Sequence, residues 1–308
     1  MTVGESDRSS ATLRRRLRSH VETLCAFDPP RCWGSPGLAA AGTWVRDALH
    51  AATGDSHVQA YDVVIGRRRE KVWNVVTRIG DGPGPLRVIG AHYDAVAGTP
   101  GADDNASAVA VLLELARLLA AAPGTAGGPV ELVAYTLEEP PAFSTSDMGS
   151  AFHAAHLRRS RTPVEGMISL EMVGYFDSSP GSQALPSGVG ALLPNAPDVG
   201  DFYALTGKAY ARKWVEAVSH SLRAHLRTPL LTLVLPDNFH ATDLSDHVPY
   251  QELGIPALML GDTSHYRNPH YHAPTDLPHT LDYDRMADLT SALAGWLATP
   301  VSAGPAPG

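Results

Sequence analysis

The chain has 308 residues, of which 44% are hydrophobic and 18% are charged, and its formal net charge at pH 7 is −8. This composition excludes a disordered chain, a collagen-like chain and a disulfide-stapled miniprotein, and the acidic balance argues against a nucleic-acid partner. A chain of this length buries enough surface to fold without staples or repeats, so we expect a soluble globular enzyme.

The cysteines and the N-terminus predict the compartment. Cys25 and Cys32 could form one local disulfide, but a loop through Pro29 and Pro30 in a reduced protein fits the sequence equally well. So few cysteines are typical of a reducing compartment. Residues 1–10 lack the apolar core of a signal peptide, and no apolar run is long enough to cross a bilayer. We therefore expect a cytoplasmic protein with no membrane partner.

Two helices and three strands are predicted in the first third of the chain. Leucine and valine at helical spacing predict a helix over residues 14–27. Ser35 before Pro36 is typical of the cap of a second helix, which should end near residue 52. Alternating and apolar runs predict strands over residues 58–65, 72–79 and 86–92.

Helices and strands alternate in the rest of the chain. Helices are predicted over residues 105–119, 148–157, 211–226 and 283–298. Strands are predicted over residues 130–137, 166–173, 202–206, 231–235 and 255–260. This alternation predicts an α/β fold with a mixed, mostly parallel central sheet and helices on both faces. We expect one domain over residues 11–300, with flexible ends at residues 1–10 and 301–308.

Polar side chains gather where several predicted strands end, which is where ligands bind in open α/β sheets. Three strand ends carry the side chains of His92, Asp94, Glu138, Glu139 and Glu171. The segment 101–107 adds two carboxylates where a loop enters a helix, and the segment 268–272 adds imidazoles. Histidine and carboxylates without cysteine suit a Zn²⁺ ion with an open coordination position, or a close pair of divalent ions.

Each of these motifs alone has a plainer explanation. A single histidine is most often a surface residue, and adjacent acids such as Asp103 and Asp104 most often form a solvated loop or favour a helix start. However, Glu138 and Glu139 follow an apolar strand, where burying two carboxylates is costly without a partner. The plain explanation would also have to hold independently for every segment, so we favour a shared metal site.

In the order and type of five motifs, the chain resembles the co-catalytic zinc aminopeptidases of the M28 class. The motifs are His-x-Asp at 92–94, Gly-Ala-Asp-Asp-Asn-Ala-Ser at 101–107, Glu-Glu at 138–139, Leu-Glu-Met at 170–172 and Asn-Pro-x-Tyr-His at 268–272. The resemblance covers roughly residues 20–298. It implies the fold of bacterial leucyl aminopeptidases and glutaminyl cyclases. It also implies a metal-dependent hydrolase of small peptides or aminoacyl amides, most simply an aminopeptidase.

Matched residue by residue, the resemblance implies two Zn²⁺ ions per chain. The implied ligands are Asp104 as the bridge, His92 and Glu171 for one ion, and Glu139 and His272 for the other. Glu138 would be the general base for a metal-bridged water, Asp94 would lie behind His92, and Tyr271 would hydrogen-bond the oxyanion. Position 171 is Glu where the best-studied aminopeptidases have Asp, and His270 is the alternative ligand to His272.

Other functions stay open. A glutaminyl-cyclase-like acyltransferase would use one zinc ion to polarise an amide for intramolecular attack. A dedicated amide hydrolase of specialised metabolism and a silent binding protein on the same scaffold are further alternatives. Ser245-Asp246-His247 does not indicate a serine hydrolase, because triad members adjacent in sequence cannot generally form the relay. We expect this segment to form a wall of the pocket.

Overall fold

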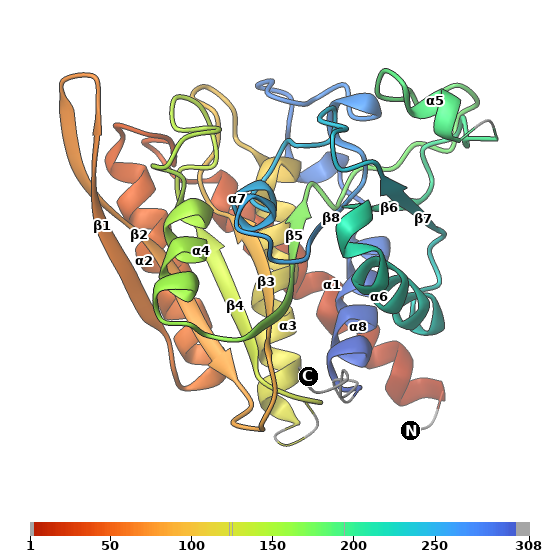
Figure 1. Cartoon of the computed structure of the whole chain (residues 1–308), viewed down its shortest axis with the longest axis horizontal. Helices are drawn as coiled ribbons and strands as arrows, with labels where there is room; N and C mark the ends of the chain where they lie inside the picture. The colour runs from red at the N-terminus through yellow and green to blue at the C-terminus, as the bar shows by residue number, and fades with distance from the viewer. Residues whose placement is uncertain (1–2, 123, 125, 194, 300–308) are drawn as a thin grey trace.

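The computed structural model describes residues 3–122, 124, 126–193 and 195–299, and its strands form one mixed sheet with helices on both faces (Figure 1). The strand order is β1-β2-β4-β3-β5-β8-β6-β7, and the four central strands β4, β3, β5 and β8 run parallel. Strands β1 and β2 extend one edge in antiparallel fashion, and β6 is antiparallel to β8. The strands are β1 (His57–Ile65), β2 (Arg68–Ile79), β3 (Leu86–His92), β4 (Val130–Tyr135), β5 (Val164–Glu171), β6 (Tyr203–Lys208), β7 (Leu230–Leu235) and β8 (Ala257–Gly261).

Most of the helices cover one face of the sheet. They are α1 (Val3–Cys25), α2 (Pro36–Thr53), α3 (Ala108–Ala121), α6 (Arg212–His225) and α8 (Tyr283–Leu297). The other face carries α4 (Gly149–Arg159) and α7 (Val248–Glu252), while the short α5 (Val189–Leu192) belongs to a long loop beside β6 and β7 (Figure 1). None of the described helices combines the length and the hydropathy that a bilayer-spanning helix needs.

The fold class predicted from the sequence is confirmed, and the predicted strands and longer helices match the observed ones within a few residues, except that α1 begins at Val3 and not near residue 14. Ser35 caps α2 by accepting a hydrogen bond from the backbone N–H of Gly37, as the Ser-Pro pair indicates. Residues 3–10, which we expected to be flexible, belong to the first turns of α1, whereas residues 301–308 lie outside the described part of the chain. The short helices α5 and α7 were not predicted, because one turn is too short to show a period.

The predicted helix over residues 105–119 begins later than expected. A π-helical turn, Ala102–Ser107, precedes α3, and within it Asp104 (φ −103, ψ 89) and Asn105 (φ −132, ψ 33) leave the helical region. The peptide bond between these two residues is cis. The Asn105 side chain holds the turn against the end of β5, since its amide donates to Leu170 O at 3.0 Å and accepts from Met172 N at 3.0 Å. The helix prediction failed here because this tertiary contact overrides the local helical pattern.

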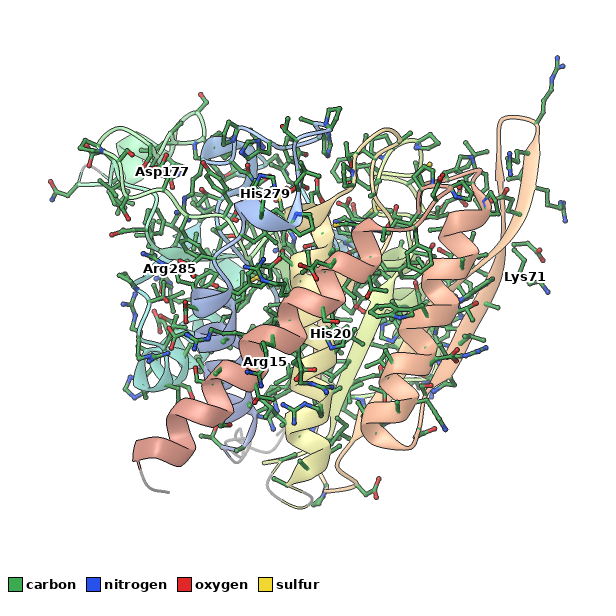
Figure 2. All side chains as sticks on the ribbon, turned by 180° about the vertical axis from the view of Figure 1, so that it is seen from behind. Arg15, His20, Lys71, Asp177, His279 and Arg285 are labelled. Carbon is green, nitrogen blue, oxygen red and sulfur yellow. The ribbon has the colours of Figure 1, made fainter. Side chains whose placement is uncertain are left out.

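Helix α1 packs on α3 and α8 through an apolar stripe and a buried ion cluster. Leu17, Val21 and Leu24 are at most 1% exposed. Glu114 of α3 is fully buried and accepts hydrogen bonds from Arg16 (2.7 Å) and His20 (2.9 Å) of α1. Figure 2 shows α1 crossing the back of the molecule, with His20 on the side that faces α3.

The sheet has one region whose two faces differ. Leu258 and Leu260 of β8 and Leu205 of β6 belong to the core with α6 and α8. On the opposite face, Met259, Ala204 and Thr206 line a cavity instead of packing under a helix. This alternation follows from the two-residue period of strands, and it makes part of the sheet the floor of a pocket.

Candidate metal centre

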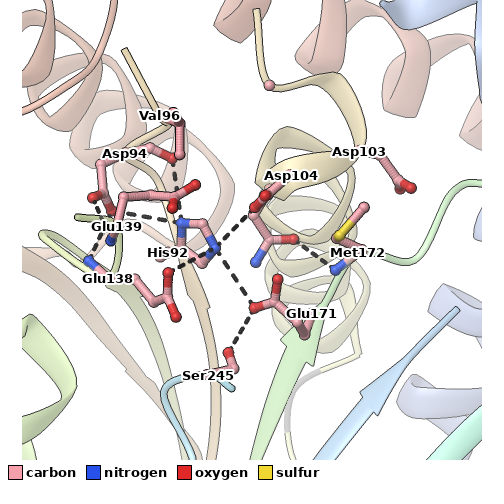
Figure 3. A network of polar contacts seen from close by, with 12 residues as sticks. His92, Asp94, Val96, Asp103, Asp104, Glu138, Glu139, Glu171, Met172 and Ser245 are labelled. Carbon is pink, nitrogen blue, oxygen red and sulfur yellow. Dashed lines mark hydrogen bonds and ion pairs between the residues drawn. The ribbon is translucent and has the colours of Figure 1, made fainter. Parts of the chain in front are cut away.

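The predicted site residues converge at the carboxyl ends of the central strands (Figure 3). His92 is the last residue of β3 and Glu171 the last residue of β5, and these strands are parallel neighbours. Glu138 and Glu139 follow the end of β4, and Asp104 lies in the π-helical turn before α3. His272 comes from the loop after β8. The structure therefore brings together every ligand that the sequence indicates.

Three positions beside these side chains have left-handed backbone. Leu137 (φ 58) precedes Glu138, Met172 (φ 48) follows Glu171, and His272 itself has φ 53. Non-glycine residues avoid this region, and such residues cluster at functional sites where the surroundings impose them. Here the sharp turns aim carboxylates and an imidazole at one point.

Asp104 stands between two groups of side chains. Its Oδ1 lies 3.3 Å from His92 Nε2, which in turn lies 3.5 Å from Glu171 Oε2. Its Oδ2 lies 3.1 Å from His272 Nε2, which lies 3.4 Å from Glu139 Oε2. The two oxygens of one carboxylate thus each face a different His–carboxylate pair.

These spacings fit bound cations. Ligand atoms about 2.0–2.1 Å from one tetrahedral ion lie roughly 3.3 Å apart, which is the separation seen in both groups. Within each of the groups His92–Asp104–Glu171 and Asp104–Glu139–His272, the ligand atoms lie within 4.8 Å of one another. His92 Nε2 and Glu139 Oε1 are buried without a hydrogen-bond partner among the described residues, as expected of atoms whose partner is a metal ion.

Asp94 contacts the backbone of Glu138 and Glu139 as well as the imidazole of His92. Its Oδ1 lies 3.5 Å from His92 Nδ1, which agrees with the expected place behind the imidazole. Its two carboxylate oxygens also accept hydrogen bonds from the backbone N–H groups of Glu138 (3.2 Å) and Glu139 (3.1 Å). One buried carboxylate therefore orients side chains from two strand ends.

The metal-free cluster has strongly shifted pKa values. Burial, together with Glu171 and Glu139, raises the pKa of Glu138 well above its usual range against the opposing effect of His92. Burial and the charge of Asp104 raise the pKa of Glu139 to about 8. Burial alone would lower the pKa of His272, but hydrogen bonds with Asp104 and Glu139 raise it to about 10. Burying several carboxylates together is energetically unfavourable unless a positive charge, such as a bound cation, balances them.

Two residues support the proposed ligands through contacts that the sequence analysis did not predict. Ser245 donates a hydrogen bond from Oγ to Glu171 Oε2 at 2.6 Å. Asp276 accepts hydrogen bonds from the backbone N–H groups of Asp103 (2.8 Å) and Asp104 (3.1 Å). No local pattern marks these residues, because each acts on a segment remote in sequence.

Several other sequence predictions have a clear position in the structure. Asp103 has a structural environment, since it accepts hydrogen bonds from Gly174 N (2.9 Å) and Asn268 Nδ2 (2.7 Å). His270 belongs to none of the metal-binding groups of the described residues and contacts Thr275 Oγ1 at 2.9 Å. The ring of Tyr271 stacks on that of His272, with 3.7 Å between centroids, and it lines the cavity.

One sequence expectation is corrected, and one alternative that the sequence left open has an answer in the structure. Ser245, Asp246 and His247 are buried and do not line the cavity beside the metal centre; Thr242 and Leu244 do. Cys25 and Cys32 are unbonded, and burial raises the pKa of Cys25 to about 11. The structure thus has the reduced loop, not the disulfide.

A largely apolar cavity opens beside the cluster. Asp104, Glu138, Glu139, Glu171 and His272 form its polar end. The rest is mostly lined by apolar side chains from the loop around α5, from the loop after β7 and from β6, β7 and β8, among them Leu185, Phe202, Leu231, Leu233 and Met259. A ligand with an apolar group next to a polar reacting centre fits this arrangement.

Comparison with known proteins gives matches over most of the chain. The sequence model of peptidase family M28 matches residues 74–297. Uncharacterized protein YfbL of Escherichia coli (strain K12) is 44% identical over 228 residues, which are 71% of this chain and 68% of that protein. Leucine aminopeptidase 1 of Trichophyton equinum is 24% identical over 272 residues, which are 83% of this chain and 65% of that protein. The chain thus spans about two thirds of the length of these relatives.

Solved structures share the fold. LapB from Legionella pneumophila superposes with a TM-score of 0.70 at 22% identity, covering 94% of this chain and 73% of that one. Glutaminyl cyclase from Porphyromonas gingivalis superposes with a TM-score of 0.67 at 19% identity, covering 92% of this chain and 97% of that one. The same fold therefore occurs in LapB and in a glutaminyl cyclase.

Proposed function

Because the chain belongs to peptidase family M28, we propose that it is a metal-dependent hydrolase of peptide or amide bonds, and specifically an aminopeptidase. The observation that carries this proposal is the position of Asp104. Its two carboxylate oxygens face His92 with Glu171 on one side and His272 with Glu139 on the other, at 3.1–3.5 Å. We propose that these five residues hold two Zn²⁺ ions, with Asp104 as the bridge.

Bound divalent cations lower the pKa of water and polarise a substrate carbonyl. Glu138 is then the general base. It is buried at the polar end of the cavity, and its Oε2 lies 3.7 Å from His92 Nε2. It is close enough to His92 and Glu139 to form a third candidate group with them, but it belongs to neither group that shares Asp104. Glu138 takes a proton from the attacking water and gives it to the leaving amine. Tyr271 lines the cavity and stacks on His272, which supports our proposal that its hydroxyl donates a hydrogen bond to the oxyanion.

The apolar cavity supports a substrate with a hydrophobic N-terminal residue. Its polar end holds the proposed ligands, so an apolar side chain in the cavity would leave the adjacent carbonyl near Glu138. Leucine aminopeptidase 1 among the relatives is named for such a substrate. The cytoplasmic location expected from the sequence remains a prediction.

Metal content and hydrolysis, measured together, test the proposed function. We expect about two Zn²⁺ ions per chain and cleavage of leucine amides that is lost on chelation and restored by Zn²⁺. One Zn²⁺ ion per chain with cyclisation of N-terminal glutamine, but no hydrolysis, would instead show the glutaminyl-cyclase activity. A wild-type protein that binds no metal would contradict both.

A further inference from the structure

Arg31 lies in the loop between α1 and α2, before the residues that match the family, and it is 1% exposed. A buried guanidinium is costly unless its donors are satisfied. No carboxylate oxygen lies within 4.0 Å of its nitrogens among the residues that the structure describes. The side chain must therefore be held by something other than an ion pair.

Its partners are backbone carbonyls. Nε donates to Leu24 O (3.2 Å), Nη1 donates to Tyr93 O (3.0 Å) and Asp94 O (2.9 Å), and Nη2 donates to Pro100 O (3.1 Å) and to Gly101 O. A guanidinium has five N–H groups, so each has one acceptor. The backbone carbonyl of Arg31 also accepts a hydrogen bond from Ala95 N at 3.1 Å.

Four of these five carbonyls belong to the two segments that carry proposed metal ligands. Tyr93 and Asp94 directly follow His92, and Pro100 and Gly101 precede Asp104 by a few residues. The packing here is close, because a Cβ at Gly101 would lie 2.6 Å from Arg31 Nη2 and 2.4 Å from Asp104 O. Arg31 thus connects the end of β3 to the π-helical turn.

Asp276 holds the same turn from its other side. Its carboxylate accepts from the N–H groups of Asp103 and Asp104, while Arg31 binds the carbonyls of Pro100 and Gly101. Neither residue belongs to a proposed ligand group. The guanidinium of Arg31 on the carbonyl groups and the carboxylate of Asp276 on the amide groups together fix the path of the backbone that carries Asp104.

We propose that Arg31 is a positioning residue of the metal centre, which sets the distance between His92 and Asp104 by binding the backbone of both their segments. This inference rests on the proposed metal function of these two side chains. Because metal ions require ligands at fixed separations, loss of the guanidinium should weaken metal binding without removing any ligand.

The test compares Arg31 with a second buried arginine, Arg87 of β3, whose Nε lies 4.0 Å from a carboxylate oxygen of Glu165. Arg87 is 2% exposed and also binds backbone carbonyls, with Nη2 3.0 Å from Leu297 O and Nη1 3.3 Å from Thr299 O. It lies five residues before His92 on β3, which is roughly 16 Å along the strand. Zn²⁺ affinity, measured by competition with a chelator, and the Tm of the metal-free protein are determined for wild type, Arg31→Met, Arg31→Lys and Arg87→Met.

We expect a lower metal-free Tm for Arg31→Met and for Arg87→Met, but a roughly 10- to 100-fold loss of Zn²⁺ affinity only for Arg31→Met. Arg31→Lys, with three donors in place of five, should lose less affinity, and it serves as the variant if Arg31→Met does not fold. Unchanged affinity in the Arg31 variants, or an equal loss in Arg87→Met, would overturn the positioning role. A wild type that binds no Zn²⁺ would instead overturn the proposed function, and the role of Arg31 with it.

Discussion

Adjacent residues at one strand end have different tasks in this molecule. Glu138 and Glu139 both donate their backbone N–H groups to Asp94, yet their side chains diverge. Glu139 approaches His272 and shares a group with Asp104, while Glu138 lies nearer His92. Because both backbones are held by one carboxylate, the neighbouring side chains can take the two proposed roles, Glu139 as ligand and Glu138 as base.

Replacement of the base separates these tasks. Glu138→Gln keeps the shape of the side chain but cannot accept a proton, so we expect hydrolysis to fall by about 10²- to 10⁴-fold. Metal content should stay at the wild-type value, because the proposed ligands are unchanged. Turnover on leucine amide and metal per chain are measured on the same preparation. Near-normal turnover would remove Glu138 from its role.

The imidazoles near the end of the chain provide a matched pair. We expect His272→Ala to lower the metal bound per chain, because His272 Nε2 lies 3.1 Å from Asp104 and 3.4 Å from Glu139. His270→Ala should bind as much metal as wild type, since that side chain contacts Thr275 instead. The metal bound per chain is measured by elemental analysis after dialysis. An equal loss of metal in the two variants would contradict the assignment of His272 as a ligand.

The sequence indicated the ligands but not the residues that orient them. His92, Glu138 and Glu171 were predictable because strand ends in an α/β sheet meet at one edge. Ser245, Asp276 and Arg31 act through hydrogen bonds to segments that are 74, 172–173 and 62–70 residues away. Such contacts leave no periodic pattern, so only the tertiary structure reveals them.

At the scale of elements, the start of α3 is a boundary that another element sets. The strand Leu86–His92 was predicted at its observed limits, because its burial alone defines it. The start of α3 was not, because Asn105 is bound to the backbone at the end of β5. Local propensity therefore predicts the limits of an element only where no contact with a residue distant in sequence replaces the hydrogen bonds within that element.

The packing of α1 on α3 depends on Glu114. We expect Glu114→Gln to destabilise the protein by about 1.5–3 kcal/mol, the range for a hydrogen bond to a charged group, because Arg16, His20 and Arg117 all bind this buried carboxylate. Glu22→Gln is the matched control on α1. Its exposed pair with Arg18, at 3.9 Å, should contribute within about 0.5 kcal/mol. Urea unfolding of both variants measures the difference.

The same contact has a defined pH dependence. Burial would raise the pKa of Glu114, but His20, Arg117 and Arg16 outweigh it and lower the pKa to about 2. A carboxyl with a lowered folded-state pKa stabilises the fold above its unfolded value of about 4.5, and that stability is lost as the pH falls toward 2. The stability difference between wild type and Glu114→Gln should therefore shrink over this interval. A constant difference would show that the charge of Glu114 does not matter.

For the whole molecule, metal binding and folding are linked. The pKa of Glu139 is raised to about 8 and that of His272 to about 10, so both hold protons in the metal-free fold that a cation must displace. Raised values stabilise the metal-free fold below the unfolded values, near 4.5 and 6.5, and this contribution is lost as the pH rises through 8 and 10. Metal affinity should rise with pH over the same interval, because the protons that compete with the cation are lost.

The gap in Tm between Zn²⁺-loaded and metal-free protein should thus widen from pH 6 to pH 8. At a free Zn²⁺ concentration one hundred times Kd, each site should add about 2.7 kcal/mol to the free energy of unfolding. Thermal unfolding at both pH values, with and without chelator, measures the gap. A gap that narrows with rising pH would contradict the linkage to Glu139 and His272.

The first two helices, α1 and α2, belong to the folded unit although the family model does not include them. The sequence model of peptidase family M28 matches residues 74–297, which leaves α1 and α2 outside it. Yet Leu17, Val21 and Leu24 of α1 are sealed in the core, and Arg31 binds the backbone on which His92 and Asp104 stand. The region that the family model matches is therefore smaller than the unit that folds. A fragment that begins at residue 74 would keep the proposed metal ligands and Glu138, but it would lose the packing of α1 and the hydrogen bonds of Arg31 to the backbone beside His92 and Asp104.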